Sequence, residues 1–198
     1  MNLKIRRYKK TDLDSLYQIC LRTGDNGKDA TGYYNDKKLI GHIYSAPYAI
    51  FEPELCFILS MDSNPCGYIL GTKNTIRFKK WLKNKWYFKL QKSYSMPLNE
   101  DNSRDANLIR QLYVQQDYRE EFENYPAHLH IDILPNAQRR GYGRKLINAF
   151  LKELIYQKVK GVHLIVSKKN INAINFYQKV GFTNFKYLKE SILFYKSL

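Results

Sequence analysis

The chain of 198 residues contains no run of ~18 apolar residues, which is the length that a membrane-spanning helix needs. Its opening residues, Met1 to Lys10, are charged and alternate between apolar and polar, and they lack the apolar core of a signal peptide. We therefore expect a cytoplasmic protein that does not contact a membrane.

Cysteine is also scarce. The three cysteines, Cys20, Cys56 and Cys66, have an odd count and irregular spacing, which argues against a disulfide framework or a zinc site. Reduced thiols packed in a core are the simplest interpretation, because free cysteine behaves as a small apolar side chain. We predict no metal site.

Acidic residues are few compared with basic ones: 18 Asp and Glu stand against 33 Lys and Arg, and the net charge is +15. This balance favours anionic partners, namely phosphorylated cofactors, nucleic acid or acidic surfaces. It does not choose among them.

The hydrophobic pattern predicts a single domain over residues 1–198, with no internal repeat and no linker. Residues 28–54 contain several glycines and prolines and are predicted to be irregular. Strands are predicted around 129–133 and 162–166, and a helix capped by Asn172 follows the second.

A basic, aromatic helical segment is predicted at about 75–92, with Phe78, Trp81, Leu82 and Phe88 on its apolar side. Its lysines could pair with phosphates while its two tryptophans, Trp81 and Trp86, stack on bases, as in nucleic-acid-binding modules. We favour a solvated helix whose aromatics face the core. A nucleic-acid partner is therefore not expected.

A glycine loop between the strand at 129–133 and a strongly amphipathic helix is the central signal. Helices begin with unpaired N–H groups and a partial positive charge, and glycines let a phosphate approach them closely. Gly141 and Gly143 provide that access here. The loop is not a Walker A sequence, because no Gly-Lys-Ser/Thr follows it. It is not a dinucleotide fingerprint either, because Leu146 replaces the third glycine. By itself it could also be a plain turn.

A second motif follows downstream: Asn170, Ala173, Phe176, Tyr177, Gly181 and Phe182. Together with the Gln138-x-x-Gly141-x-Gly143 loop, it resembles the GNAT superfamily of acyl-CoA N-acyltransferases over roughly residues 127–182. The resemblance implies an α/β (α+β) fold of the GNAT type. Its central mixed, mostly antiparallel sheet would be flanked by helices and splayed at the strand containing Ile131, where the cofactor enters.

The resemblance also implies a role for individual residues. Backbone groups of Ile131, Asp132 and Ile133 would pair with the pantetheine arm of acetyl-CoA, and Asn170 would contact the cofactor near the active centre. Backbone N–H groups of the glycine loop would hold the pyrophosphate. The cofactor-binding residues expected in this loop are Gln138, Arg139, Arg140, Gly141, Tyr142, Gly143 and Arg144.

Tyr177 is the expected catalytic acid in this resemblance, with its hydroxyl beside the thioester sulfur. A thiol has a pKa of ~8.5 and tyrosine ~10, so a neutral tyrosine can donate a proton or hydrogen bond to the departing thiolate. The bland alternative is a core tyrosine on an amphipathic helix.

The general base is less well determined. Some GNAT enzymes use a glutamate at the position of Ile165, which cannot serve. The candidates are Asp132, His130, His128 and Glu123, and we choose Asp132. His128, His130 and Asp132 share one face if the strand is regular, whereas a β-bulge would change which side chains face the site.

A narrower resemblance covers nearly the whole chain. The segments Thr23-Gly24-Asp25, Glu52-Pro53-Glu54 and 67–72, with the strand at 129–135, resemble bacterial GNAT proteins related to the acetyltransferase-like C-terminal domain of O-GlcNAcase. Residues 24–54 would then form a loop over the acceptor site. The aromatics that could line it, or simply pack against one another, are Tyr33, Tyr34, Tyr44 and Tyr48.

The predicted function is an acetyl-CoA-dependent N-acetyltransferase that transfers an acetyl group to an unidentified primary amine in a ternary complex. A GNAT-like protein that binds acetyl-CoA without turnover is the alternative, and a basic nucleic-acid-binding module is a weaker one. The acceptor is not determined by the sequence, and neither is the oligomeric state, for which a homodimer stays open.

Overall fold

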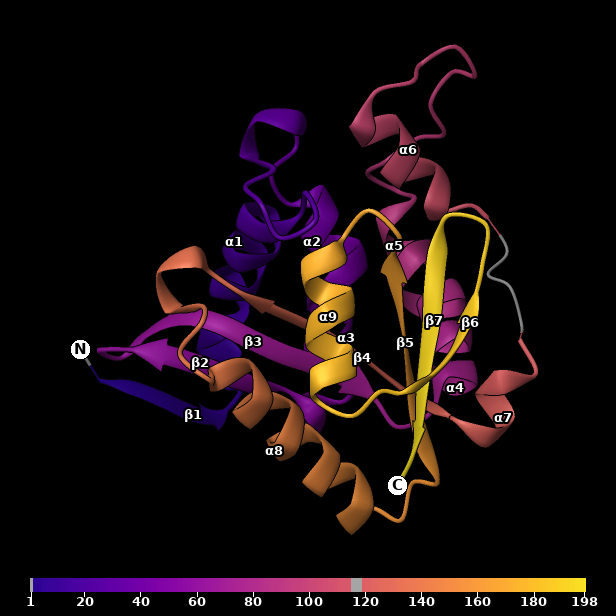
Figure 1. Cartoon of the computed structure of the whole chain (residues 1–198). Helices are drawn as coiled ribbons and strands as arrows, with labels where there is room; N and C mark the ends of the chain where they lie inside the picture. The colour runs from indigo at the N-terminus through magenta and orange to yellow at the C-terminus, as the bar shows by residue number, and fades with distance from the viewer. Residues whose placement is uncertain (1, 115–118) are drawn as a thin grey trace.

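The computed structural model describes residues 2–114 and 119–198 and is built on one seven-stranded sheet of order β1-β2-β3-β4-β5-β7-β6 (Figure 1). Its strands are β1 (Leu3–Arg7), β2 (Phe57–Met61), β3 (Asn64–Thr72), β4 (Ala127–Ile133), β5 (Gly161–Ser167), β6 (Asn184–Tyr187) and β7 (Ser191–Ser197). Neighbouring strands are antiparallel except β4 and β5, which are parallel. The predicted mixed, mostly antiparallel sheet is confirmed.

Helices cover both faces of the sheet. They are α1 (Leu13–Thr23), α2 (Leu39–Tyr44), α3 (Ala46–Phe51), α4 (Thr75–Trp81), α5 (Phe88–Leu90), α6 (Arg104–Gln111), α7 (Glu121–Asn124), α8 (Tyr142–Tyr156) and α9 (Ile171–Lys179). In the view of Figure 1, α8 and α9 lie in front of the sheet, and α1 and α2 lie behind it. Helix α1 packs against β3 and β4 on one face of the sheet, and α8 packs against β2, β3 and β4 on the opposite face.

The sheet splays between β4 and β5, as predicted. These two strands pair only at Ala127 with Val162 and at His128 with His163, whereas β4 pairs with β3 along its whole length. In Figure 1 the two strands run away from each other beyond this point. The side of β4 that faces β5 is therefore left without a strand partner from residue 129 onward.

The predicted basic helix spans α4, a π-helical segment (Leu82–Tyr87) and α5. Phe78 and Leu82 are buried as expected, but Phe88 is 59% exposed and Tyr87 and Leu90 are buried instead. A π-helical turn adds a residue to the turn, so the next buried side chain after Leu82 is that of Tyr87. A regular period of 3.6 cannot anticipate that shift.

The tryptophans of this segment pack against the protein. The rings of Trp81 and Trp86 stack 6.0 Å apart, and the Trp86 indole donates to the His42 carbonyl oxygen at 2.8 Å. Their stacking faces are thus engaged in packing, which favours the solvated-helix interpretation over a base-stacking surface.

Residues 28–54 are more ordered than predicted, since they contain α2 and α3. Gly41 lies under Tyr17, where an added Cβ would stand only 2.3 Å from the ring, and Pro47 lies in the first turn of α3. The glycine therefore permits close helix packing, and the proline occupies a position where its missing N–H is harmless. The three cysteines are buried and unpaired, as expected. Among the described residues, no helix combines the length and apolar character needed to cross a membrane.

Candidate active site

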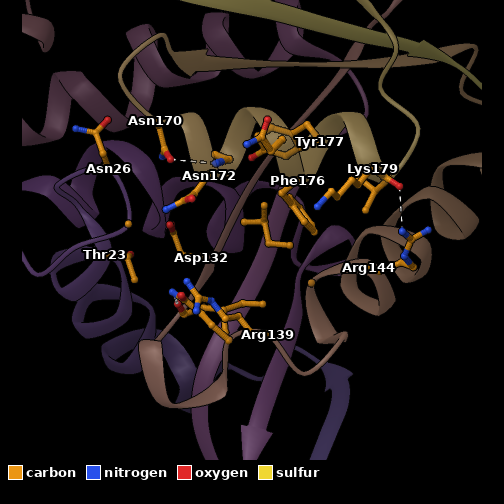
Figure 2. Close-up of a pocket in the computed structure, with 18 of the residues that line it drawn as sticks. Thr23, Asn26, Asp132, Arg139, Arg144, Asn170, Asn172, Phe176, Tyr177 and Lys179 are labelled. Carbon is orange, nitrogen blue, oxygen red and sulfur yellow. Dashed lines mark hydrogen bonds between the residues drawn. The ribbon is translucent and has the colours of Figure 1, made fainter.

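A cavity of about 750 Å³ opens where β4 and β5 separate (Figure 2). Its walls come from the end of α1, from β4, from the glycine loop and from α9. The predicted site residues that line it are Ile131, Asp132, Ile133, Gln138, Arg139, Gly141, Gly143, Arg144, Asn170 and Tyr177. Arg140 and Tyr142 belong to the same loop but do not line the cavity. The Tyr142 hydroxyl instead donates to the Leu3 carbonyl oxygen at 2.8 Å and anchors the start of α8 to β1.

The start of α8 presents backbone N–H groups to this cavity. Gly141 precedes the helix with a left-handed backbone (φ 78°), and no side chain of the described residues caps it. Lys145 makes the first backbone bond back to Gly141, at 3.3 Å. The N–H groups of Tyr142, Gly143 and Arg144 therefore have no partner within the helix, and an anion can bind there.

Two contacts hold the glycine loop at the correct distance from α9. A Cβ added to Gly143 would stand 3.0 Å from the Phe176 ring, so even a small side chain there would require the ring to shift. The Arg144 guanidinium donates to the Lys179 carbonyl oxygen at 3.0 Å, which links the start of α8 to the end of α9 (Figure 2).

The backbone of β4 is directed alternately toward β3 and into the gap. The N–H of Leu134 donates to the Cys66 carbonyl oxygen at 2.8 Å. Because backbone groups alternate in direction along a strand, every second residue of β4 before Leu134 also bonds with β3. Ile131 and Ile133 consequently direct their backbone groups into the gap. The Gln138 side chain already donates to the Ile133 carbonyl oxygen at 2.7 Å. As far as the described residues show, the N–H and carbonyl of Ile131 and the N–H of Ile133 remain available for a ligand.

Asp132 enters the cavity through its side chain, because its backbone pairs with Tyr68 on β3. The Tyr68 hydroxyl donates to Oδ2 of Asp132 at 2.7 Å. Burial raises the pKa of the Asp132 carboxyl to about 6, although hydrogen bonding from Tyr68 and Thr23 offsets part of that increase. A carboxylate with this pKa is mostly ionised at neutral pH and still accepts a proton readily.

His128 shares the face of Asp132, since the register between β3 and β4 is unbroken and the bulge considered above is absent from it. The Thr75 hydroxyl donates to the Pro126 carbonyl oxygen at 2.7 Å and also contacts Nδ1 of His128 at 2.7 Å. Its only hydrogen is thus used, so Nδ1 carries the imidazole hydrogen and Nε2 accepts from the Tyr48 hydroxyl at 2.8 Å. Both ring nitrogens are committed, and burial keeps the pKa of His128 well below its usual value.

The two other candidates for the base lie outside the cavity lining. Burial lowers the pKa of His130 to about 4, and Glu123 belongs to α7, beyond the walls of the cavity. Asp132 is therefore the one candidate base that lines the cavity within the described chain.

Tyr177 lies on α9 with 8% of its surface exposed, and it lines the same cavity as Asp132 (Figure 2). Burial and the nearby Asp132 raise its pKa above the usual tyrosine value, so the hydroxyl stays protonated and can donate. Asn170, rather than the predicted Asn172, caps α9: its Oδ1 accepts the Ala173 N–H at 3.1 Å.

The sequence interpretation missed several lining residues. The lining residues that the sequence did not predict as site residues include Thr23, Asn26, Lys28, Asn172, Asn175 and Lys179. Residues 25–28 form a tight hairpin, with positive φ at Asn26 and Gly27 and reciprocal backbone bonds of 3.0 Å between Asp25 and Lys28. The Asn-Gly pair is a strong turn signal. The pair predicts the turn, whereas its position over the cavity depends on the tertiary structure.

The comparisons agree with this geometry. Residues 6–182 match the model of the Acetyltransferase (GNAT) family. The chain belongs to this family. A solved structure described as SsHAT is 33% identical, with a TM-score of 0.89 over 100% of this chain and 98% of that one. The PaiA N-acetyltransferase from Thermoplasma acidophilum, solved in complex with coenzyme A, is 15% identical with a TM-score of 0.60, over 100% of both chains.

The narrower resemblance is also confirmed. The O-GlcNAcase of Rattus norvegicus is 25% identical over 180 residues, which cover 89% of this chain. The chain spans only 20% of the length of that relative, and the same holds for the Mus musculus protein.

Proposed function

We propose that this GNAT acetyltransferase is an acetyl-CoA-dependent N-acetyltransferase that acts on a primary amine in a ternary complex. One observation carries the proposal: a carboxylate with a raised pKa, a protonated tyrosine and an uncapped helix start line the same cavity. The carboxylate can accept a proton, the tyrosine can donate one, and the helix start can bind phosphate.

Acetyl-CoA fits the groups that the cavity leaves available. The N–H groups at the start of α8 would hold the pyrophosphate, with Arg139 nearby on the cavity wall. The carbonyl of Ile131 and the N–H of Ile133 would pair with the amide groups of the pantetheine arm, as an added strand does. The coenzyme A bound to the Thermoplasma acidophilum relative supports this assignment.

The proposed reaction needs a base and an acid. Asp132 takes one proton from the ammonium form of the acceptor, and the free amine attacks the acetyl carbon. The N–H group of Ile131 polarises the acetyl oxygen as a C–N bond forms. The C–S bond then breaks, and Tyr177 gives its proton to the thiolate. The second amine proton is released and restores Tyr177, so the products are an amide and free coenzyme A.

Thiol release from acetyl-CoA tests the proposal. The purified protein is mixed with acetyl-CoA and libraries of amino sugars, polyamines, amino acids and lysine peptides, and free coenzyme A is measured with a thiol reagent. Release that depends on one amine class is expected. Calorimetry with coenzyme A runs in parallel: binding without release for every class would instead support a non-catalytic binding protein, and no binding would refute both.

A further inference from the structure

Tyr68 is a fully buried tyrosine directly behind Asp132. Its side chain is 0% exposed and does not line the cavity. It stands opposite Asp132 in the register of β3 and β4, and its hydroxyl donates to Oδ2 at 2.7 Å. Side chains opposite each other on neighbouring strands lie on the same face, so this contact follows from the register itself.

The pair is unfavourable for folding alone. Burial raises the pKa of the Asp132 carboxyl, which means that its charged form is poorly solvated there. A well-packed apolar pair at two central strands would avoid that penalty. The polar pair is therefore better explained by the chemistry of the cavity than by stability.

The groups that face Asp132 are neutral. Tyr68 faces it from β3, Cys20 from α1 and Tyr177 from α9, and the pKa of each is raised, chiefly by burial. No cation contributes to the pKa of Asp132 among the described residues. The orientation of the carboxylate thus depends on hydrogen bonds rather than on an ion pair, and the Thr23 hydroxyl shares its one hydrogen with the Ile19 carbonyl oxygen at 2.7 Å.

We infer that Tyr68 is a positioning residue for Asp132: its hydroxyl holds Oδ2, so that Oδ1 is presented to the amine in the cavity. The inference rests on the proposed role of Asp132 as the base. Tyr68 itself does not line the cavity, so it acts through Asp132. Because it donates to the charged form of the carboxylate, it also keeps Asp132 ionised at a lower pH than burial alone would permit.

Tyr68→Phe tests the inference without any acceptor. The protein is labelled with 13C at aspartate carboxyl carbons, and the Asp132 signal, assigned with Asp132→Asn, is followed by NMR as pH changes. The midpoint of that signal should rise by about one pH unit in Tyr68→Phe, since one hydrogen bond to the charged form is lost. Tyr48→Phe is the matched control, because it removes a buried tyrosine hydroxyl from His128 instead. Its Asp132 midpoint should stay at the wild-type value.

The pH–rate profile provides the second readout once an acceptor is known. In Tyr68→Phe the acid limb of kcat/KM should move upward by the same unit, with the affinity for acetyl-CoA unchanged. If Tyr68→Phe does not fold, 3,5-difluorotyrosine at position 68 replaces it, and this stronger donor should lower the Asp132 midpoint.

The outcomes separate the two proposals. An Asp132 midpoint that neither substitution moves would overturn the positioning role and leave the base untouched. Full turnover in Asp132→Asn would overturn the base and the positioning role together.

Discussion

Replacing Asp132 with asparagine should stabilise the folded protein above pH 6 while it removes the proposed base. The Asp132 carboxyl has a pKa of about 6 in the folded chain, against 3.8 ordinarily. The difference, about 6 minus 3.8, is roughly two units and corresponds to ~3 kcal/mol at ~1.4 kcal/mol per unit. The carboxylate opens into a cavity that admits water, so we expect about 2 kcal/mol. Asparagine resembles the protonated acid and can still accept from Tyr68.

The sign follows from proton binding. The folded chain holds this proton more tightly than the unfolded chain, so ionisation of Asp132 opposes folding. The penalty is absent below pH 3.8 and complete above about pH 6. The gain from Asp132→Asn should therefore be full at pH 8 and nearly lost at pH 4.

Urea unfolding at these two pH values measures the effect. With a slope of ~2–3 kcal/mol per molar urea, the midpoint of Asp132→Asn should lie about 0.7–1 M above wild type at pH 8. Equal midpoints at pH 8, or the same difference at both pH values, would refute the reasoning. Asp12→Asn is the control of opposite sign. Burial raises the pKa of Asp12, but bonds from Arg6 and the Lys9 N–H outweigh this and lower it overall. That variant should be less stable than wild type at pH 8.

Three further predictions concern the cofactor site, the acid and the pH dependence. Gly143→Leu should weaken coenzyme A binding at least ~100-fold in calorimetry, because a side chain there collides with the Phe176 ring at the helix start; undiminished affinity would exclude this anion site. Tyr177→Phe should lower kcat by about 10²-fold while the Kd for acetyl-CoA changes less than about twofold, and unchanged turnover would remove Tyr177 from the mechanism. Burial lowers the pKa of His130 from 6.5 to about 4, so its neutral form is favoured on folding and stability is lost as pH falls through this window. His130→Phe should therefore be relatively more stable than wild type at pH 5 than at pH 7 in urea unfolding, by about 2 kcal/mol; an identical difference at both values would contradict it.

Local sequence patterns were sufficient to predict the glycine loop and the helix that carries Tyr177, because each is formed by a few consecutive residues. The glycine loop needs a left-handed residue and an uncapped helix start, and Gly141 at φ 78° supplies both within a few residues. Asn170 and Tyr177 are likewise held by one helix, α9, although the predicted cap, Asn172, lies two residues after the observed one. Such motifs are legible because backbone geometry over a few residues determines them.

Other features depend on contacts between distant segments. The π-helical segment that buries Tyr87 in place of Phe88 is a response to packing against the protein body. Gly41 and Pro47 are residues that commonly end helices, so residues 28–54 are predicted to be irregular. In the structure Gly41 lies within a helix, where the lack of a side chain lets the backbone pack closely on Tyr17. Intrinsic propensity is a weak prior that tertiary contacts override.

The catalytic proposal shows the same division. The sequence by itself identified the family and marked the glycine loop and Tyr177 as candidate site residues, because those residues belong to recognisable local motifs. The choice between Asp132 and the histidines required the fold: hydrogen bonds from Thr75 and Tyr48, far away in the chain, commit both nitrogens of His128. The raised pKa of Asp132 and its contact with Tyr68 arise only when β3 and β4 pair and α1 covers them. Burial and cross-strand register are properties of the assembled sheet, so no local pattern could encode them.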